Sequence, residues 1–177
     1  MGSSFSAIDW SAWTPTEQAT LLFVIDGDQI LLIRKKRGLG EGKVNGPGGR
    51  REHGESLAEC AIRETHEELG VTAHNPVLSG RHQFQFTDGY ALEVYVYYAT
   101  QFQGLAIETD EAVPLWTHVD AIPYDEMWED DRLWLPLLLA KETFDGRYLF
   151  DGDRMLGHEL DISVDVDALS QQRPSAQ

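Results

Sequence analysis

Three carboxylates stand at helical spacing in residues 63–71, which read RETHEELGV. Side chains three and four residues apart in a helix lie on one face, about 5–6 Å from one another. Glu64, Glu67 and Glu68 would therefore repel each other. A hard divalent cation would relieve that repulsion, because carboxylate oxygens are the ligands that Mg²⁺ prefers. The alternative is a solvated acidic face on an ordinary amphipathic helix, and the three carboxylates alone do not decide between the two interpretations.

The residues around these carboxylates predict a helix that begins at Ser56 and ends at Gly70. Ser56 followed by Glu59 is a capping-box pattern, and glycine commonly supplies the left-handed residue that ends a helix. Ahead of the helix, residues 46–49 read GPGG, and this small loop lets the backbone approach a ligand or metal closely. The predicted core-facing positions, which recur at helical spacing, are Leu57, Ala58, Ala61, Ile62, Thr65 and Leu69.

The spacing of glycines and charged residues over residues 49–71 resembles the Nudix box. The matching positions are Gly49, Glu55, Arg63, Glu64, Glu67, Glu68 and Gly70. Thr65 departs from the family pattern, which usually has an aliphatic residue there, but this is a packing position and no chemistry depends on it. The resemblance implies an α/β (α+β) Nudix fold, a mixed β-sheet sandwiched between α-helices. It also implies hydrolysis of a nucleoside diphosphate linked to another group.

The same resemblance implies which residues perform the chemistry. Phosphoanhydride cleavage needs charge neutralisation and an in-line water more than covalent help from the protein, and Mg²⁺, with Mn²⁺ as the alternative, supplies both. Arg63 would orient the carboxylates through charge-assisted hydrogen bonds, assisted by Glu55. Glu111 matches a position where relatives carry a metal-binding or base carboxylate; a solvated loop glutamate is an equal alternative. The predicted catalytic residues are Arg63, Glu64, Glu67, Glu68 and Glu111, and the predicted metal ligands are the Gly48 carbonyl, Glu64, Glu67, Glu68 and Glu111.

Residues outside the box resemble the branch of the family that hydrolyses oxidised purine nucleoside triphosphates. The similarity runs from about residue 20 to residue 161 and includes KKRG at residues 35–38 and MWEDD at residues 127–131. In that branch a tryptophan stacks on the base, two aspartates contact one edge of it, and an asparagine contacts it from the other side. The substrate-binding residues that the resemblance implies are Thr20, Lys35, Leu39, Asn45, Phe84, Phe86, Trp128, Asp130 and Asp131.

The adjacent pair Asp130 and Asp131 also has a chemical rationale for reading a base. Two carboxyl groups held close together do not both ionise easily, so one pKa should rise. A pair that shares one proton offers a purine edge both a donor and an acceptor, and moving the proton would accommodate either 8-oxo-dGTP or 2-oxo-dATP. The alternative is helix N-capping, and Asp131 could cap the helix while Asp130 reads the base.

Three positions depart from the pattern of that branch. Leu39 and Pro47 replace aromatic residues, and Val44 replaces a tryptophan, which leaves the preferred base open. Two other hypotheses remain: a Nudix hydrolase of another diphosphate such as ADP-ribose, and a non-catalytic domain that senses a nucleotide. The Trp128, Asp130, Asp131 and Asn45 set argues against the first, and the complete set of box carboxylates argues against the second.

The composition narrows the possible partners. A net charge of −16 argues against binding nucleic-acid polymers, which requires a basic surface. Basic residues are nevertheless gathered at residues 34–51, where they form either a solvated strand edge or a guide for a polyphosphate. No apolar run is long enough to span a membrane, no signal-peptide pattern is present, and Cys60 is the single cysteine. We therefore expect a cytoplasmic monomer with a small-molecule nucleotide substrate and no membrane partner, in which Cys60 is a packing residue.

The pattern along the chain predicts one Nudix domain at residues 19–164. A loose arm at residues 1–18, which includes two tryptophans, precedes it and is expected to tuck onto the domain, and a polar tail at residues 165–177 follows and is expected to fray. Turn sequences at residues 26–29, 87–90 and 151–153 predict three hairpins. A further strand is predicted at residues 112–119, and a second helix is predicted after Asp131, with Pro136 close to its first turn.

Overall fold

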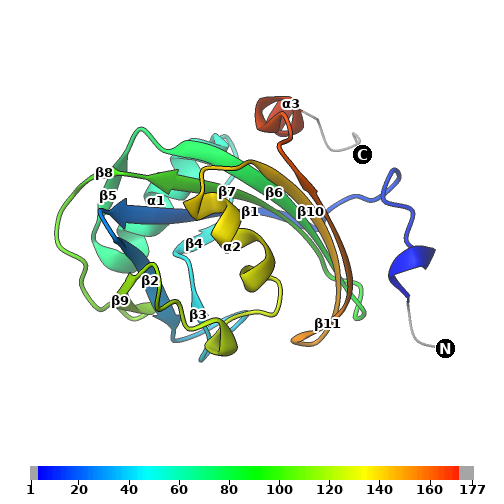
Figure 1. Ribbon diagram of the computed structural model, residues 1–177, viewed down its shortest axis with the longest axis horizontal. Helices are drawn as coiled ribbons and strands as arrows, with labels where there is room; N and C mark the ends of the chain where they lie inside the picture. The colour runs from blue at the N-terminus through cyan, green and yellow to red at the C-terminus, as the bar shows by residue number, and fades with distance from the viewer. Residues whose placement is uncertain (1–3, 172–177) are drawn as a thin grey trace.

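The computed structural model describes residues 4–171 (Figure 1). Its strands are β1 (Glu17–Asp26), β2 (Gln29–Lys35), β3 (Val44–Asn45), β4 (Gly48–Arg50), β5 (Thr72–His74), β6 (Val77–Phe86), β7 (Ala91–Ala99), β8 (Gln101–Gln103), β9 (Ala112–His118), β10 (Phe144–Asp151) and β11 (Arg154–Ile162). Its helices are α1 (Leu57–Leu69), α2 (Asp131–Leu139) and α3 (Val166–Gln171), with 3₁₀ turns η1 (Phe5–Ala7) and η2 (Tyr124–Glu126).

Within the described residues, nine strands form one mixed sheet in the order β11-β10-β6-β7-β1-β2-β3, with β4 paired to β1 and β9 paired to β2. The three predicted hairpins are confirmed as the antiparallel pairs β1–β2, β6–β7 and β10–β11. Parallel pairs join β1 to β7 and β6 to β10, which makes the sheet mixed. Strands β5 and β8 form a separate two-stranded sheet.

Helix α1 has the predicted ends. The Ser56 hydroxyl accepts a hydrogen bond from the Glu59 N–H (3.1 Å), and Gly70 ends the helix with a left-handed φ of 75°. Thr65 is fully buried and its hydroxyl donates to the Ala61 carbonyl (2.8 Å), which satisfies the one polar group at that packing position. The helix therefore presents its apolar face to the sheet and its carboxylates to the side.

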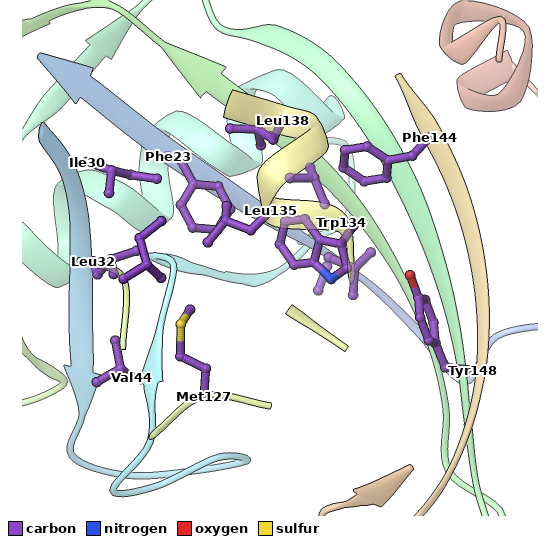
Figure 2. Packing of buried hydrophobic residues seen from close by; sticks show 14 of the residues in the cluster. Phe23, Ile30, Leu32, Val44, Met127, Trp134, Leu135, Leu138, Phe144 and Tyr148 are labelled. Carbon is purple, nitrogen blue, oxygen red and sulfur yellow. The ribbon is translucent and has the colours of Figure 1, made fainter. Parts of the chain in front are cut away.

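The two faces of the sheet are covered by different helices, because successive side chains of a strand point to opposite faces. On β1, Leu22 and Val24 belong to a core shared with α1. Phe23 belongs to a second core, where its ring lies 5.8 Å from that of Trp134 on α2. Figure 2 shows this second core between α2 and the strands. The predicted mixed sheet between helices is confirmed.

The terminal segments pack onto the sheet. In the N-terminal arm the Trp13 indole N–H donates to the Gln85 side chain on β6 (2.9 Å), and Phe5 lies where a side chain at Gly157 of β11 would stand. Strand β1 begins at Glu17, slightly earlier than predicted. The expected fraying from residue 165 is wrong for residues 166–171, which form α3 with Val166 buried; the rest of the predicted tail lies outside the described residues. None of the helices in the described part of the chain is long and apolar enough to cross a membrane.

Candidate active site

A cavity of about 240 Å³ lies on the α2 side of the sheet. Its lining includes Glu68 of α1 and, from the start of α2, Asp130 and Asp131. Aromatic and aliphatic side chains from β1, β6 and β7 line it as well. One pocket is thus lined by Glu68 of the predicted metal site and by residues predicted to contact a base.

A cluster of three carboxylates forms at the α1 end of this pocket. Glu64, Glu68 and Glu111 each offer one oxygen, and these oxygens lie within 4.8 Å of one another. Glu111 stands directly before β9, where its carbonyl accepts a hydrogen bond from the Lys36 N–H (3.0 Å) at the end of β2. The pairing of β9 with β2 thus carries Glu111 across the fold to the helix, which favours the metal-site interpretation over a solvated loop glutamate.

Burial makes this cluster poor at holding three negative charges without a counter-ion. Glu68 is 4% exposed, and its pKa is raised to about 8 by burial, with the charge of Glu64 as the second cause. Burial also raises the pKa of Glu64, although hydrogen bonding from Arg63 opposes the rise. The Oε2 atom of Glu68 is buried and has no hydrogen-bond partner among residues 4–171. An oxygen-only donor set with one unpartnered oxygen fits a hard divalent cation.

Arg63 holds the acidic side chains in place, as predicted. Its guanidinium bonds Glu55 (2.5 and 3.1 Å), Glu64 (2.8 Å) and Glu67 (3.1 Å). The bonds from Arg63 lower the pKa of Glu55, so Glu55 favours its ionised form and is an anionic partner that holds the Arg63 guanidinium. The Glu67 side chain is 49% exposed and lies outside the group of three. Its catalytic and metal-binding roles stay predictions.

The two glycines before α1 give the cluster its space. A Cβ atom on Gly49 would overlap the Glu64 carboxyl group, and one on Gly48 would overlap the Thr20 carbonyl. Any larger residue at position 49 would displace Glu64 from the cluster. The loop lies close to Glu64 and Thr20 because both glycines lack a side chain, while its predicted approach to a ligand or metal, including the role of the Gly48 carbonyl as a metal ligand, stays a prediction.

Aromatic side chains surround the other end of the pocket. Trp128 packs edge-on against Phe86 and Phe150, with ring centroids 6.2 and 5.6 Å away. The Lys43 ammonium lies 5.4 Å from the centre of its ring. Phe84 lines the same wall. The structure therefore places a half-buried indole and three phenylalanine rings, those of Phe84, Phe86 and Phe150, around the space beside the aspartates.

Asp130 and Asp131 are almost completely buried, at 2% and 7% exposure. Burial raises the pKa of Asp130 to about 6 and, with the charge of Asp130 as the second cause, raises that of Asp131 well above its usual value. The two carboxyl groups are hydrogen-bonded to each other, which requires a proton on one of them. Asp130 occupies the N-cap position of α2 but makes no capping hydrogen bond; its Oδ2 atom accepts from the Trp134 indole N–H (2.7 Å). The capping alternative is thus wrong for Asp130.

The remaining predicted substrate residues occupy different parts of the pocket. Asn45, Lys35 and Leu39 line it, and the Lys35 pKa is lowered by burial although Glu68 lies close enough to raise it. Thr20 is 1% exposed, and its hydroxyl is hydrogen-bonded to the Cys60 sulfur (3.3 Å) on the α1 side. A substrate contact by the Thr20 hydroxyl stays a prediction. Cys60 is buried, and burial raises its pKa to about 11, as expected of a packing residue.

Some lining residues were not predicted as site residues. Tyr90 and Phe150 line the pocket together with Arg50, and Trp134 fixes Asp130. Arg50 directly follows the double glycine, and this position in the sequence could have identified it as a site residue. Tyr90 and Phe150 lie at the ends of strands whose pairing partners are distant in sequence, so no local pattern identifies them.

Comparison with known proteins agrees with this geometry. A family model described as the NUDIX domain matches residues 15–138. The chain is 40% identical over 149 residues to the "Oxidized purine nucleoside triphosphate hydrolase" of Danio rerio, covering 83% of this chain and 96% of that protein. It is 37% identical over 143 residues to the Mus musculus protein of the same name, covering 80% and 92%.

Solved structures give the same result. A MutT protein from Bacillus halodurans superposes with a TM-score of 0.73 at 29% identity, covering 82% of this chain and 97% of that one. A MutT NUDIX hydrolase from Burkholderia pseudomallei superposes with a TM-score of 0.61 at 25% identity, covering 68% and 95%. Because the family model spans more than half of the chain and the relatives align over most of their length, this protein belongs to the NUDIX family of hydrolases.

Proposed function

We propose that the protein is a Mg²⁺-dependent pyrophosphohydrolase of oxidised purine nucleoside triphosphates, releasing the nucleoside monophosphate and pyrophosphate and so clearing damaged nucleotides from the precursor pool. The observation that carries this proposal is the buried, hydrogen-bonded pair Asp130 and Asp131 in a pocket that is also lined by Glu68, a member of the carboxylate cluster of Glu64, Glu68 and Glu111. The names of the Danio rerio and Mus musculus relatives support the same substrate class.

At the base end, the aspartate pair supplies hydrogen-bond donors and acceptors in a nearly dry site. One protonated and one ionised carboxyl group present both kinds of partner to a purine edge. A site built to hydrogen-bond a substrate group rejects an analogue that leaves its buried polar atoms unpaired, often by a large factor. Trp128 offers a flat face for stacking at low entropic cost. These properties favour a modified purine over an unmodified one.

At the phosphate end, Glu64, Glu68 and Glu111 would hold the divalent cation, with Mg²⁺ favoured over Mn²⁺. The chemistry supplied by the bound cation is neutralisation of phosphate charge and polarisation of a water. Arg63 keeps Glu64 oriented, and Lys35 adds a positive charge to the pocket wall beside Glu68. Water is limited at the buried Glu68 oxygen, where electrostatic interactions are stronger than at the surface.

The test is pyrophosphate release from 8-oxo-dGTP, 2-oxo-dATP, dGTP and ADP-ribose side by side, with Mg²⁺, with Mn²⁺ and with a chelator. The proposal expects metal-dependent release of pyrophosphate and a clear preference for an oxidised purine. Preference for ADP-ribose would leave the Nudix chemistry and remove the substrate assignment. Tight nucleotide binding without turnover would point to a nucleotide sensor.

The setting of the enzyme is also a proposal. We infer a cytoplasmic monomer that acts on small nucleotides, because the free cysteine is buried and no disulfide is formed among the described residues. The net charge of −16 makes an extended contact with a nucleic-acid polymer unfavourable.

A further inference from the structure

A chain of hydrogen bonds runs along the mouth of the pocket, between residues that the chemistry above does not use. The Tyr90 hydroxyl donates to Oε2 of Glu17 (2.5 Å). The other carboxylate oxygen of Glu17 accepts from the Arg50 guanidinium (3.0 Å). Tyr90 and Arg50 both line the pocket. Glu17 therefore connects a tyrosine on one wall to a cation on another.

The sheet register brings these three residues together. Strand β1 pairs with β4 on one side, where Ala19 lies opposite Arg50. On its other side β1 pairs with β7, where Glu17 lies opposite Leu92, two residues after Tyr90. Glu17 thus stands at the first position of β1, between the end of β4 and the turn that precedes β7. Backbone pairing therefore sets the positions of Glu17 and Arg50, and Tyr90 lies in the turn directly before β7.

Arg50 is attached to the metal-site scaffold through its backbone. Its carbonyl accepts a hydrogen bond from Arg63 (3.1 Å), and it follows Gly49, the residue whose missing side chain makes room for Glu64. Among the described residues that line the pocket, Lys35 and Arg50 carry the positive charges. A polyphosphate bound in this pocket would therefore find its cationic partners in Lys35 and Arg50.

The pair formed by Arg50 and Glu17 leaves the Arg50 guanidinium accessible. The Arg50 side chain is 74% exposed and that of Glu17 is 31% exposed. The Arg50 group bonded to Glu17 is Nη1, and a guanidinium has five N–H donors. Arg50 can therefore bind the oxygens of a phosphate while Glu17, which also accepts from Tyr90, still holds it in place.

We propose that Arg50 binds the phosphate chain of the nucleotide and that Glu17 and Tyr90 are positioning residues that hold its guanidinium at the pocket mouth. This inference rests on the proposed function, because it takes a nucleoside polyphosphate as the substrate. It assigns to Tyr90 a role that acts entirely through Arg50. A surface ion pair with a structural role only would stabilise the fold and leave substrate affinity unchanged.

The experiment is a double-mutant cycle with Arg50→Gln and Tyr90→Phe, measured by steady-state hydrolysis of 8-oxo-dGTP. Arg50→Gln should raise KM about tenfold with kcat changed less than about twofold, as for loss of binding made equally in ground and transition states. Tyr90→Phe should raise KM about threefold in the wild-type background and have no effect in the Arg50→Gln background, because coupled residues are not additive. The control is Arg147→Gln, which breaks a more buried ion pair with Asp161 (3.1 Å) outside the pocket lining; it should leave KM unchanged.

The inference is overturned if KM is unchanged in Arg50→Gln, if the effects of the two substitutions multiply independently, or if Arg147→Gln raises KM equally. Melting temperatures show whether each variant is folded. Any variant that does not fold is replaced by Glu17→Gln, which keeps the shape of the side chain. Failure of the proposed function gives a different result, since the wild-type protein itself would then not prefer an oxidised purine. The same cycle can in that case be measured on whichever nucleoside diphosphate derivative the wild type hydrolyses.

Discussion

The indole N–H of Trp134 donates a 2.7 Å hydrogen bond to Asp130, four residues earlier in the chain. Both side chains are buried, and the bond occupies one oxygen of the carboxylate and aligns the other with the neighbouring Asp131. The second turn of α2 thereby orients a group at the helix N-terminus toward the pocket, where a capping bond would have turned it onto the helix backbone. The two aspartates act as one unit, whose shared proton decides what it donates and accepts.

Substitution of one aspartate should change which oxidised purine is preferred. Asp131→Asn always donates a hydrogen bond through its amide, so it keeps one proton arrangement of the pair and loses the other. We expect the ratio of kcat/KM for 8-oxo-dGTP to that for 2-oxo-dATP to change by about tenfold or more, because a mismatched buried polar group is costly. Asp120→Asn, at a side chain that is 88% exposed, is the matched control. An unchanged ratio in Asp131→Asn would remove the pair from base recognition.

The same pair should make stability depend on pH. Its folded pKa values lie above those of unfolded aspartate, about 3.9, so the folded state binds protons more tightly. The contribution of the pair to the free energy of unfolding is then greatest below about pH 4 and is lost as the pH rises through the folded pKa of Asp130, about 6, by linkage. A variant with asparagine at positions 130 and 131 does not lose stability in this way as the pH rises.

The measurement is thermal unfolding of the wild type and this double variant at several pH values. The melting temperature of the variant minus that of the wild type should increase from acidic to neutral pH, since all other titrating groups are shared. A constant difference would mean that the pair does not bind a proton in the folded state.

Loss of one carboxylate from the cluster should abolish most turnover while the fold remains. We expect Glu68→Gln to lower kcat at least about a hundredfold, because the donor set loses a charge that neutralisation of the cation requires. Its melting temperature without metal should equal or exceed that of the wild type, since a buried like charge is removed. Glu59→Gln, on an exposed position of the same helix, serves as the control. Near-normal turnover of folded Glu68→Gln protein would refute the assignment.

A methyl group at position 49 should damage the metal site through Glu64. The Cβ atom of Gly49→Ala would overlap the Glu64 carboxyl group, so that side chain must move. We expect the Mg²⁺ concentration for half-maximal activity to rise about tenfold or more, as for displacement of one ligand. Magnesium titration of activity, with a melting curve to verify folding, measures this. If the titration curve of Gly49→Ala matched that of the wild type, Glu64 would not need to occupy the position seen here.

Local patterns in the sequence predicted the parts of the site that lie on one element. The helix ends at Ser56 and Gly70, the carboxylates of α1 and the small loop before it all follow from spacing and residue type. The exposure of Glu67 does not, because it depends on which carboxylate Arg63 draws toward itself. Glu111 reaches the cluster because β9 pairs with β2. The sequence alone does not give this pairing, so it did not distinguish a metal-site carboxylate from a solvated loop glutamate.

Long-range pairing accounts for what the sequence did not predict. The bond from Trp134 to Asp130, the Tyr90–Glu17–Arg50 chain and the packing of α3 on the sheet all join residues whose proximity is set by sheet register or tertiary packing. Val166, in the polar C-terminal stretch, gave too weak a periodic signal for a helix. Its burial against the sheet stabilises a six-residue helix that would be marginal in isolation.

The central claim is that the aspartate pair and Trp128 make this hydrolase selective for an oxidised purine. The most direct test is the ratio of kcat/KM for 8-oxo-dGTP to that for dGTP, measured with the wild-type protein and Mg²⁺. We predict a ratio of about ten or more, as expected where one hydrogen-bonding group distinguishes two substrates. Equal values for the two nucleotides, or a greater value for ADP-ribose than for either, would contradict the claim.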